Sequence, residues 1–173
     1  MIPQAAEKQK IMLSLLEKYT GCLCVPSNTT KPMPAYPYIS FNVINTSTKK
    51  GTYAEAKVVK DGVQTSVLYM PLLQVWSFTA QSDNDAEAME KAMLISDFFA
   101  ESMRQALENN NIIVADIGAI TPRDNLLTIE YEYRKGLDVT LRFNNIISDL
   151  SKETIEKATL TNDTVGDLML EKE

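Results

Sequence analysis

Histidine is absent from this 173-residue sequence, and its absence excludes several common catalytic designs. A chain without imidazole has no Ser-His-Asp or Cys-His activation of a nucleophile, no His-ligated zinc and no imidazole proton shuttle. Glycine is also scarce. All six glycines are isolated, so the sequence has neither a glycine-rich phosphate loop nor a Gly-x-Gly-x-x-Gly motif. Only lysine- or carboxylate-based chemistry is left open.

Cysteine and long apolar runs are nearly missing as well. Cys22 and Cys24 are separated by one residue, so on a strand they point to opposite faces and a disulfide between them is strained. Two cysteines without histidine cannot complete a zinc site in one chain, and the simpler interpretation is two small apolar residues in a reducing compartment.

No apolar run is long enough to span a bilayer, and residues 1–19 are too charged for a secretory signal. We expect a cytoplasmic product with no cofactor, no membrane contact and no enzymatic activity.

What is present describes an ordinary globular protein. Hydrophobic residues make up 45% of the chain and charged residues 23%, enough for one domain with a real core. The net charge of −6 argues against a protein that holds nucleic-acid phosphates tightly. We predict one α+β domain over residues 1–162, followed by a flexible acidic tail over residues 163–173.

Hydrophobic periodicity and turn residues give the order of elements. A short N-terminal helix runs from Pro3 to about Tyr19, and an acid-capped helix with apolar residues at helical spacing runs over about 83–108. The predicted strands are 22–25, 38–47, 72–81, 112–121 and 154–162, together with a hairpin over 125–144. This order predicts a mainly antiparallel sheet packed by one long helix and the short N-terminal helix. On the long helix we expect Met89, Met93 and Met103 to pack in the core, with an adaptable interface as the alternative.

The segment 48–70 is too long for a plain loop. Turn signals at Lys49-Lys50-Gly51 and Lys60-Asp61-Gly62 favour a β-hairpin arm. Its side chains include Lys49, Lys50, Tyr53, Lys57 and Lys60. Two interpretations stay open: a solvated strand pair whose lysines protect a sheet edge, or an arm that grips an acidic neighbour.

The hairpin Asn125–Asn144 has a register that follows from its alternation. A three-residue loop at residues 134–136 keeps apolar residues opposite apolar ones and places Gly136 where a left-handed residue is needed. The same register sets Glu132 opposite Asp138, and like charges directly opposed are destabilising. Either Arg134 or Lys135 folds back to neutralise them, or a cation comes from another subunit, and we hypothesise the second.

Several of these features recur together in one known family. They are the strand with Leu72, Val75 and Trp76, the helix Asp83–Glu108, the strand Ile112–Thr121, the Arg-Lys-Gly-Leu-Asp-Val motif at Arg134–Val139, and Thr154-Ile155-Glu156. In this combination the sequence resembles the bacteriophage neck or tail terminator proteins, which join head and tail. Leu137 stands where that family often has an aromatic residue. The resemblance covers roughly Pro37–Asn162.

The resemblance implies a structural virion protein and no enzyme. It implies a protomer that assembles into a hexameric ring at the head–tail junction, caps the tail tube and docks to the neck connector. DNA would pass through the lumen without specific binding. Another neck or head-completion protein, or a tail tube protein, is the nearest alternative. A small ligand-binding protein or enzyme is the alternative from a different class.

Overall fold

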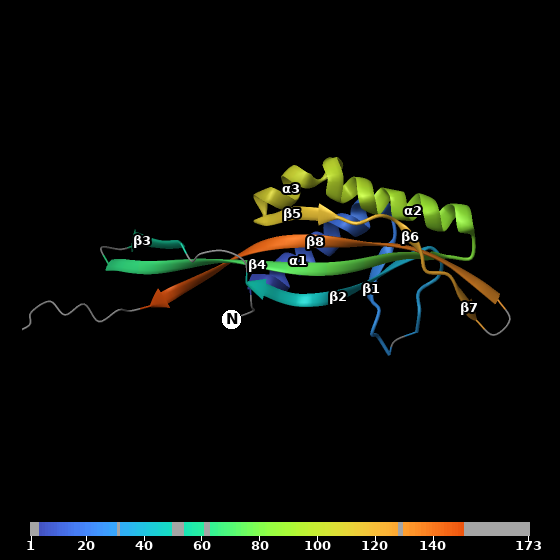
Figure 1. Ribbon diagram of the computed structural model, residues 1–173, viewed down its shortest axis with the longest axis horizontal. Helices are drawn as coiled ribbons and strands as arrows, with labels where there is room; N and C mark the ends of the chain where they lie inside the picture. The colour runs from blue at the N-terminus through green and yellow to red at the C-terminus, as the bar shows by residue number, and fades with distance from the viewer. Residues whose placement is uncertain (1–3, 31, 50–53, 61–62, 128–129, 151–173) are drawn as a thin grey trace, which may run out of the picture.

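The computed structural model describes five stretches of the chain, residues 4–30, 32–49, 54–60, 63–127 and 130–150 (Figure 1). Within these stretches, eight strands form one sheet with helices packed against it. The predicted strand Thr154–Asn162 and the acidic tail 163–173 lie outside the described residues.

The sheet is mixed, and two long strands form its centre. β4 (Val63–Ser82) and β8 (Glu130–Leu150) pair antiparallel along nearly their whole lengths. The path across the sheet is β1-β2-β4-β8-β5, with β3 paired to β4 and with β6 and β7 paired to β8. β1 runs parallel to β2, and all the other pairs are antiparallel. The shorter strands are β1 (Leu23–Pro26), β2 (Tyr38–Lys49), β3 (Ala54–Lys60), β5 (Ile112–Ile117), β6 (Thr121–Pro122) and β7 (Asn125–Leu127).

The predicted long helix over about 83–108 is wrong, because the structure divides that segment into three. They are α2 (Asp85–Asp97), the π-helical turn η1 (Phe98–Ser102) and α3 (Arg104–Asn109). The Met103 N–H reaches back five residues to the carbonyl of Phe98, at 3.3 Å. The widened turn accommodates one extra residue, and the adjacent side chains of Phe98 and Phe99 are both fully buried. The fold is therefore sheet-rich with short helices, of which α1 (Gln4–Thr20) is the longest in the described chain.

The helices share one face of the sheet, and the core lies between them and that face. α1 contributes Met12 and Leu16, and α2 with η1 contributes Ala92, Ile95, Phe98 and Phe99, all fully buried. Trp76 and Phe78 of β4 stack with ring centroids 6.1 Å apart, and Phe78 meets Phe99 at 5.2 Å. Alternate residues of β8 complete this layer, namely Leu137, Val139, Leu141 and Phe143. Alternation along a strand sends the intervening residues to the opposite, helix-free face.

The predicted hairpin loop at residues 134–136 is also wrong. β8 continues through these residues without reversing, and its register pairs Arg134 with Gln81, Lys135 with Ala80 and Gly136 with Thr79 of β4. Glu132 and Asp138 therefore lie on one strand and do not oppose each other. A three-residue loop preserves the odd–even alternation, so one strand or two explain the pattern equally well. The long partner strand β4 decides between them.

Two ends of the sheet extend past the helices (Figure 1). At one end β3 pairs with β4, from Ala54 with Tyr69 to Lys60 with Val63, and the last part of β8 pairs with the other edge of β4. At the other end β7 pairs with the first residues of β8. Among the described residues, no helix is long and apolar enough to cross a membrane.

Candidate interface residues on the helix-free face

A clamp formed by one arginine lies on the helix-free face of the sheet. Arg123, from the link between β6 and β7, donates from Nη1 to the hydroxyls of Ser77 at 2.5 Å and Thr79 at 3.1 Å. Its Nη2 pairs with Asp138 Oδ1 at 2.9 Å. Burial by itself raises the pKa of Asp138, but hydrogen bonds from Ser77 and Arg123, together with the guanidinium charge, outweigh burial and hold that pKa below its ordinary value.

Gly136 makes room for this clamp. A Cβ at this position would lie 2.7 Å from Thr79 Oγ1 and 2.8 Å from the Cζ and Nη1 atoms of Arg123. A strand glycine often marks such a close approach of another group. Gly136 is therefore needed for space within a strand, and the turn function predicted for it is incorrect.

A second cluster surrounds the buried carboxylate of Glu132, which is 3% exposed. Arg134 Nε donates to its Oε2 at 2.6 Å, and Arg134 Nη2 pairs with the same atom. The hydroxyls of Tyr36 and Tyr38 donate to Oε1 at 2.8 and 3.3 Å. Burial, together with the neighbouring carboxylate, raises the pKa of both tyrosines to about 12. The cation and both hydroxyls compensate the charge of Glu132 within one chain.

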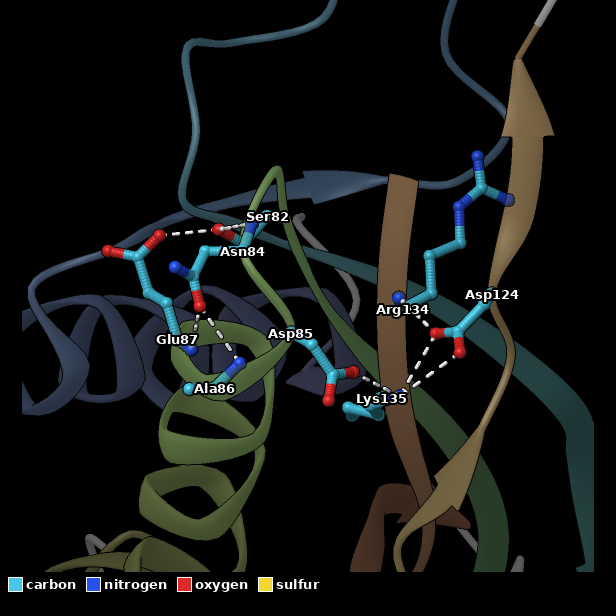
Figure 2. A network of polar contacts seen from close by, with 8 residues as sticks. All are labelled: Ser82, Asn84, Asp85, Ala86, Glu87, Asp124, Arg134 and Lys135. Atoms are coloured by element: carbon cyan, nitrogen blue, oxygen red, sulfur yellow. Dashed lines mark hydrogen bonds and ion pairs between the residues drawn. The ribbon is translucent and has the colours of Figure 1, made fainter. Parts of the chain in front are cut away.

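On the helix side of β8, Lys135 joins the start of α2 to the link between β6 and β7 (Figure 2). Its ammonium group, almost buried, pairs with Asp85 Oδ1 at 2.7 Å and with Asp124 Oδ2 at 3.1 Å. Asp124 Oδ1 also accepts the backbone N–H of Arg134 at 2.8 Å. That hydrogen bond, followed by the contact with Lys135, lowers the pKa of Asp124. The hydrogen bond to Asp85 is the largest cause of a raised pKa at Lys135.

The start of α2 is fixed by its own cap. The Asn84 side chain accepts the backbone N–H groups of Ala86 and Glu87, at 2.9 and 3.2 Å (Figure 2). Ser82, the last residue of β4, donates to a carboxylate oxygen of Glu87 in a short contact. The cap places Asp85 beside Lys135, so the helix N-terminus and the first part of β8 are held together.

The structure gathers four of the predicted contact residues, Glu132, Arg134, Lys135 and Asp138, on one strand. Their charges have partners within the chain, which the hypothesis of a cation from another subunit did not anticipate. Arg134 and Asp138 keep 30% and 43% of their side chains exposed, so a contact with another subunit stays a prediction. Sequence reasoning missed Arg123, Asp124 and Tyr36, because they come from connecting segments, and it missed Tyr38, because only the folded sheet brings the first residue of β2 beside Glu132.

The predicted basic set lies elsewhere. Lys49 ends β2, and Lys57 and Lys60 belong to β3, at the end of the sheet opposite β7 (Figure 1). Lys50 and Tyr53 lie outside the described residues. The two groups of predicted residues therefore belong to different ends of the protein.

The cysteines fit the simpler interpretation. Both are free thiols; Cys22 is buried and Cys24 half-buried. Burial, with Glu17 nearby, raises the pKa of Cys24 to about 12, so its thiol is protonated at neutral pH. Within the described residues, no group of three or more cysteine and carboxylate side chains is placed to hold a metal ion.

Comparison with known proteins gives the family. A search of curated proteins finds no match. The profile of a family described as phage neck terminator protein matches residues 10–167, which include most of α1, the other helices, the sheet and all the site residues above. Such a protein is a structural component of the phage virion and contacts other head and tail proteins. The chain therefore belongs to the phage neck terminator protein family.

Proposed function

We propose that this protein forms a closed homo-oligomeric ring, a hexamer, at the head–tail junction of a tailed phage. The ring terminates the tail tube and docks it to the neck connector, and DNA passes through its lumen. Membership of the neck terminator family supports the location. The net charge of −6 supports an acidic passage, because counterion release on basic side chains is what makes proteins adhere to DNA.

The observation that best supports assembly into a ring is the exposure of large apolar side chains on the surface of the protomer. On α2, Met89 and Met93 are 41% and 55% exposed and lie one turn apart. On the first two strands, Leu23 and Ile44 are 61% and 58% exposed. Ile44 occupies the bulge between Val43 and Asn45, where the pairing with β4 shifts register. The core position predicted for Met89 and Met93 is therefore wrong.

These two apolar surfaces belong to different borders of the molecule. Figure 1 shows α2 along one border and β2 along the other. A head-to-tail ring needs two different surfaces on each protomer, which meet between neighbours. In our proposal the methionines of α2 pack on Ile44 of the next protomer, since flexible thioether side chains adapt well to such a surface.

The projecting end of the sheet has a second role in this proposal. Lys49, Lys50, Tyr53, Lys57 and Lys60 form an arm that binds an acidic surface of the neighbouring tube or connector. Glu132, Arg134, Lys135 and Asp138 hold the opposite end of the protomer rigid, and Arg134 and Asp138 reach the next subunit through their exposed parts. The arm extends from the single domain, residues 1–162.

The mass of the assembled protein tests whether it forms a ring. Light scattering of the wild-type protein, alone and with tail tubes, should give a complex of about six protomers of 19.4 kDa each. Met93→Lys and Ile44→Lys should each leave monomers with an unchanged unfolding temperature, because both side chains are exposed. Gln105→Lys, which introduces the same side chain at an exposed position of α3, is the control. A wild-type protein that stays monomeric even on tail tubes would refute the ring.

Termination is tested separately by tube length. Tube protein that polymerises with the wild-type protein should form tubes of limited length, while the monomeric variants should leave elongation unrestricted. If this protein instead polymerises into tubes by itself, it is a tube protein and the proposed role is wrong.

A further inference from the structure

At one end of the sheet, β7 and the first residues of β8 project past the helices as a two-stranded ribbon (Figure 1). Leu126 and Tyr131 lie directly opposite each other in this ribbon, and their side chains are 69% and 50% exposed. Tyr133, two residues further along β8, contacts Tyr131 with ring centroids 5.0 Å apart. Leu126 and Tyr131 therefore form an apolar knob on the surface of the protomer.

The knob is held in a fixed position by the base of the ribbon. Lys135 pairs with Asp85 of α2 and with Asp124 just before β7 (Figure 2). Arg134 donates its backbone N–H to Asp124 and its side chain to the buried Glu132. A group that is held in place before docking loses less conformational entropy, and tyrosine is common among the anchor residues of interfaces.

A pocket of about 240 Å³ lies on the helix-free face, beside the connector that follows β1. Part of its lining is apolar and comes from Val25, Pro26 and Met33, of which Met33 is 56% exposed. The lining also includes Arg123 and Arg134, whose side chains are 31% and 30% exposed, so a group from outside the fold can reach them. A water needs about 10–15 Å³ of such space, so a whole side chain has room here.

This lining suits a phenol group better than an anion or an aliphatic group. Guanidinium groups are attracted to the face of an aromatic ring, and a methionine sulfur packs well at its edge. An anion gains less, because Arg134 already pairs with Glu132 and Arg123 with Asp138. The contacts to described residues engage only some of the five N–H donors of each guanidinium, so a phenolic oxygen can accept another.

The knob and the pocket lie on opposite faces of the sheet and extend to different edges. Gly136 pairs with Thr79 of β4 and with Thr121 of β6, and β7 continues the register of β6, so the knob lies on the edge of β8 away from β4. The pocket extends toward the other edge, where β1 and β2 lie. Alternation places Tyr131 on the same face as Lys135, which is the helix side. Two different surfaces of this kind can join copies head to tail.

We propose that Tyr131 of each protomer inserts into this pocket of the next protomer. Its aromatic ring packs between Met33 and the guanidinium groups of Arg123 and Arg134, and its phenolic oxygen accepts one of their N–H groups. This contact rests on the proposed assembly into a closed ring of protomers and identifies the surfaces that meet in it.

Disulfide cross-linking of the full-length protein, alone and on tail tubes, tests whether these surfaces meet. In a background with Cys22→Ala and Cys24→Ala, the double variant Tyr131→Cys with Met33→Cys should give a ladder of linked chains up to the full ring on a non-reducing gel. The ladder arises because each chain is linked to two neighbours. The control combines Met33→Cys with Gln105→Cys, which introduces the thiol at an exposed position of α3, and should give no ladder.

A titration tests the chemistry of the pocket without a ring of protomers. Tyr131→Ala removes the knob, and 4-methylphenol, which is the side chain of tyrosine by itself, is then added. In NMR, the methyl resonance of Met33 and the guanidinium resonances of Arg134 should shift saturably. The compound 4-methylcyclohexanol has a similar size but no aromatic face, and it should bind about two- to fivefold more weakly. Adding Met33→Ala should weaken the binding of 4-methylphenol, whereas Met93→Ala, at an exposed methionine of α2, should leave it unchanged.

Three results would overturn the proposal. A ring of the expected mass without the ladder means that other surfaces join the protomers, and the proposed function then stands without this contact. Shifts that never saturate, or equal binding of the two alcohols, mean that the pocket does not recognise an aromatic ring. A protein that stays monomeric even on tail tubes refutes the ring and this contact together. The mass reports on the ring and the ladder on the contact, so the two failures are distinguishable.

Discussion

Gly136→Ala should destabilise the protein by displacing the Arg123 clamp, although the change adds only one methyl group. The new Cβ would lie 2.7 Å from Thr79 Oγ1 and 2.8 Å from the guanidinium of Arg123. Real Cβ atoms do not approach other atoms so closely, so something must shift, and we expect the guanidinium, the far end of a flexible side chain, to move off the strand. Its hydrogen bonds to Ser77 and Thr79 and its ion pair with Asp138 are then lost.

The size of the effect follows from those contacts. A hydrogen bond to a charged group contributes about 1.5–3 kcal/mol when it is buried. Here the side chains of Arg123 and Asp138 are 31% and 43% exposed, so solvent screening leaves about 2 kcal/mol for the whole set. Alanine is favoured over glycine within a strand by roughly 0.5–1 kcal/mol, which offsets part of the loss. We expect a net destabilisation of about 1–1.5 kcal/mol, or about 2–6 °C in Tm for a chain of this size.

Thermal unfolding followed by circular dichroism measures this change. The matched control is a background that carries Arg123→Ala and Thr79→Ala, in which the side chains that hold the three closest atoms have been shortened. There Gly136→Ala should be neutral or raise Tm slightly, because only the strand preference remains. An unchanged Tm in the wild-type background, or the same loss in both backgrounds, would refute the reasoning.

Three further predictions concern the same face. Arg134→Ala should lower the free energy of unfolding, measured by urea denaturation, by about 2–4 kcal/mol, because Glu132 is left buried without its cation. Adding Glu132→Gln should recover part of this loss, and a double variant with no recovery would contradict the pairing. The pKa of Asp138 is lower in the folded than in the unfolded state, so its ionised form stabilises the fold above about pH 4 and this contribution is lost as pH falls through the folded pKa. Asp138→Asn should flatten the stability profile between about pH 5 and pH 3, and a profile parallel to the wild type would count against it. Tyr36 and Tyr38 should ionise near pH 12 in an ultraviolet titration, and Glu132→Gln should lower both pKa values only part of the way, because burial is the larger cause.

The sequence predicted much of the core but not the path of the chain. The alternation of Leu137, Val139 and Leu141 correctly marks the residues of β8 that face the helices. The same alternation also allowed the wrong prediction of a loop at residues 134–136. A three-residue loop and a continuous strand give the same pattern of apolar and polar residues. Gly136 does not separate the two, since a glycine suits both a left-handed turn and a close approach by another side chain.

Only part of the candidate site could be predicted from the sequence, for a similar reason. The sequence indicated four charged residues of β8 as contact residues, and the structure places all four in ion pairs. Their partners Arg123, Asp124 and Tyr36 belong to connecting segments. Sequence spacing does not indicate which strand such segments cross. The pocket on the helix-free face had no sequence signal at all, because its lining comes from strands and connecting segments far apart in the chain.

The sequence by itself determined which chemistry the protein lacks, through the absence of histidine and of a phosphate loop, and it carried the motifs of its family. It also determined the cap at Asn84, because a cap depends on neighbours within one turn. Only the tertiary structure decided that β8 runs straight past Gly136, that Arg123 lies over it and that Phe98 and Phe99 both turn inward. These features depend on groups far apart in the chain, and local patterns of hydrophobicity and turn residues do not encode such pairings.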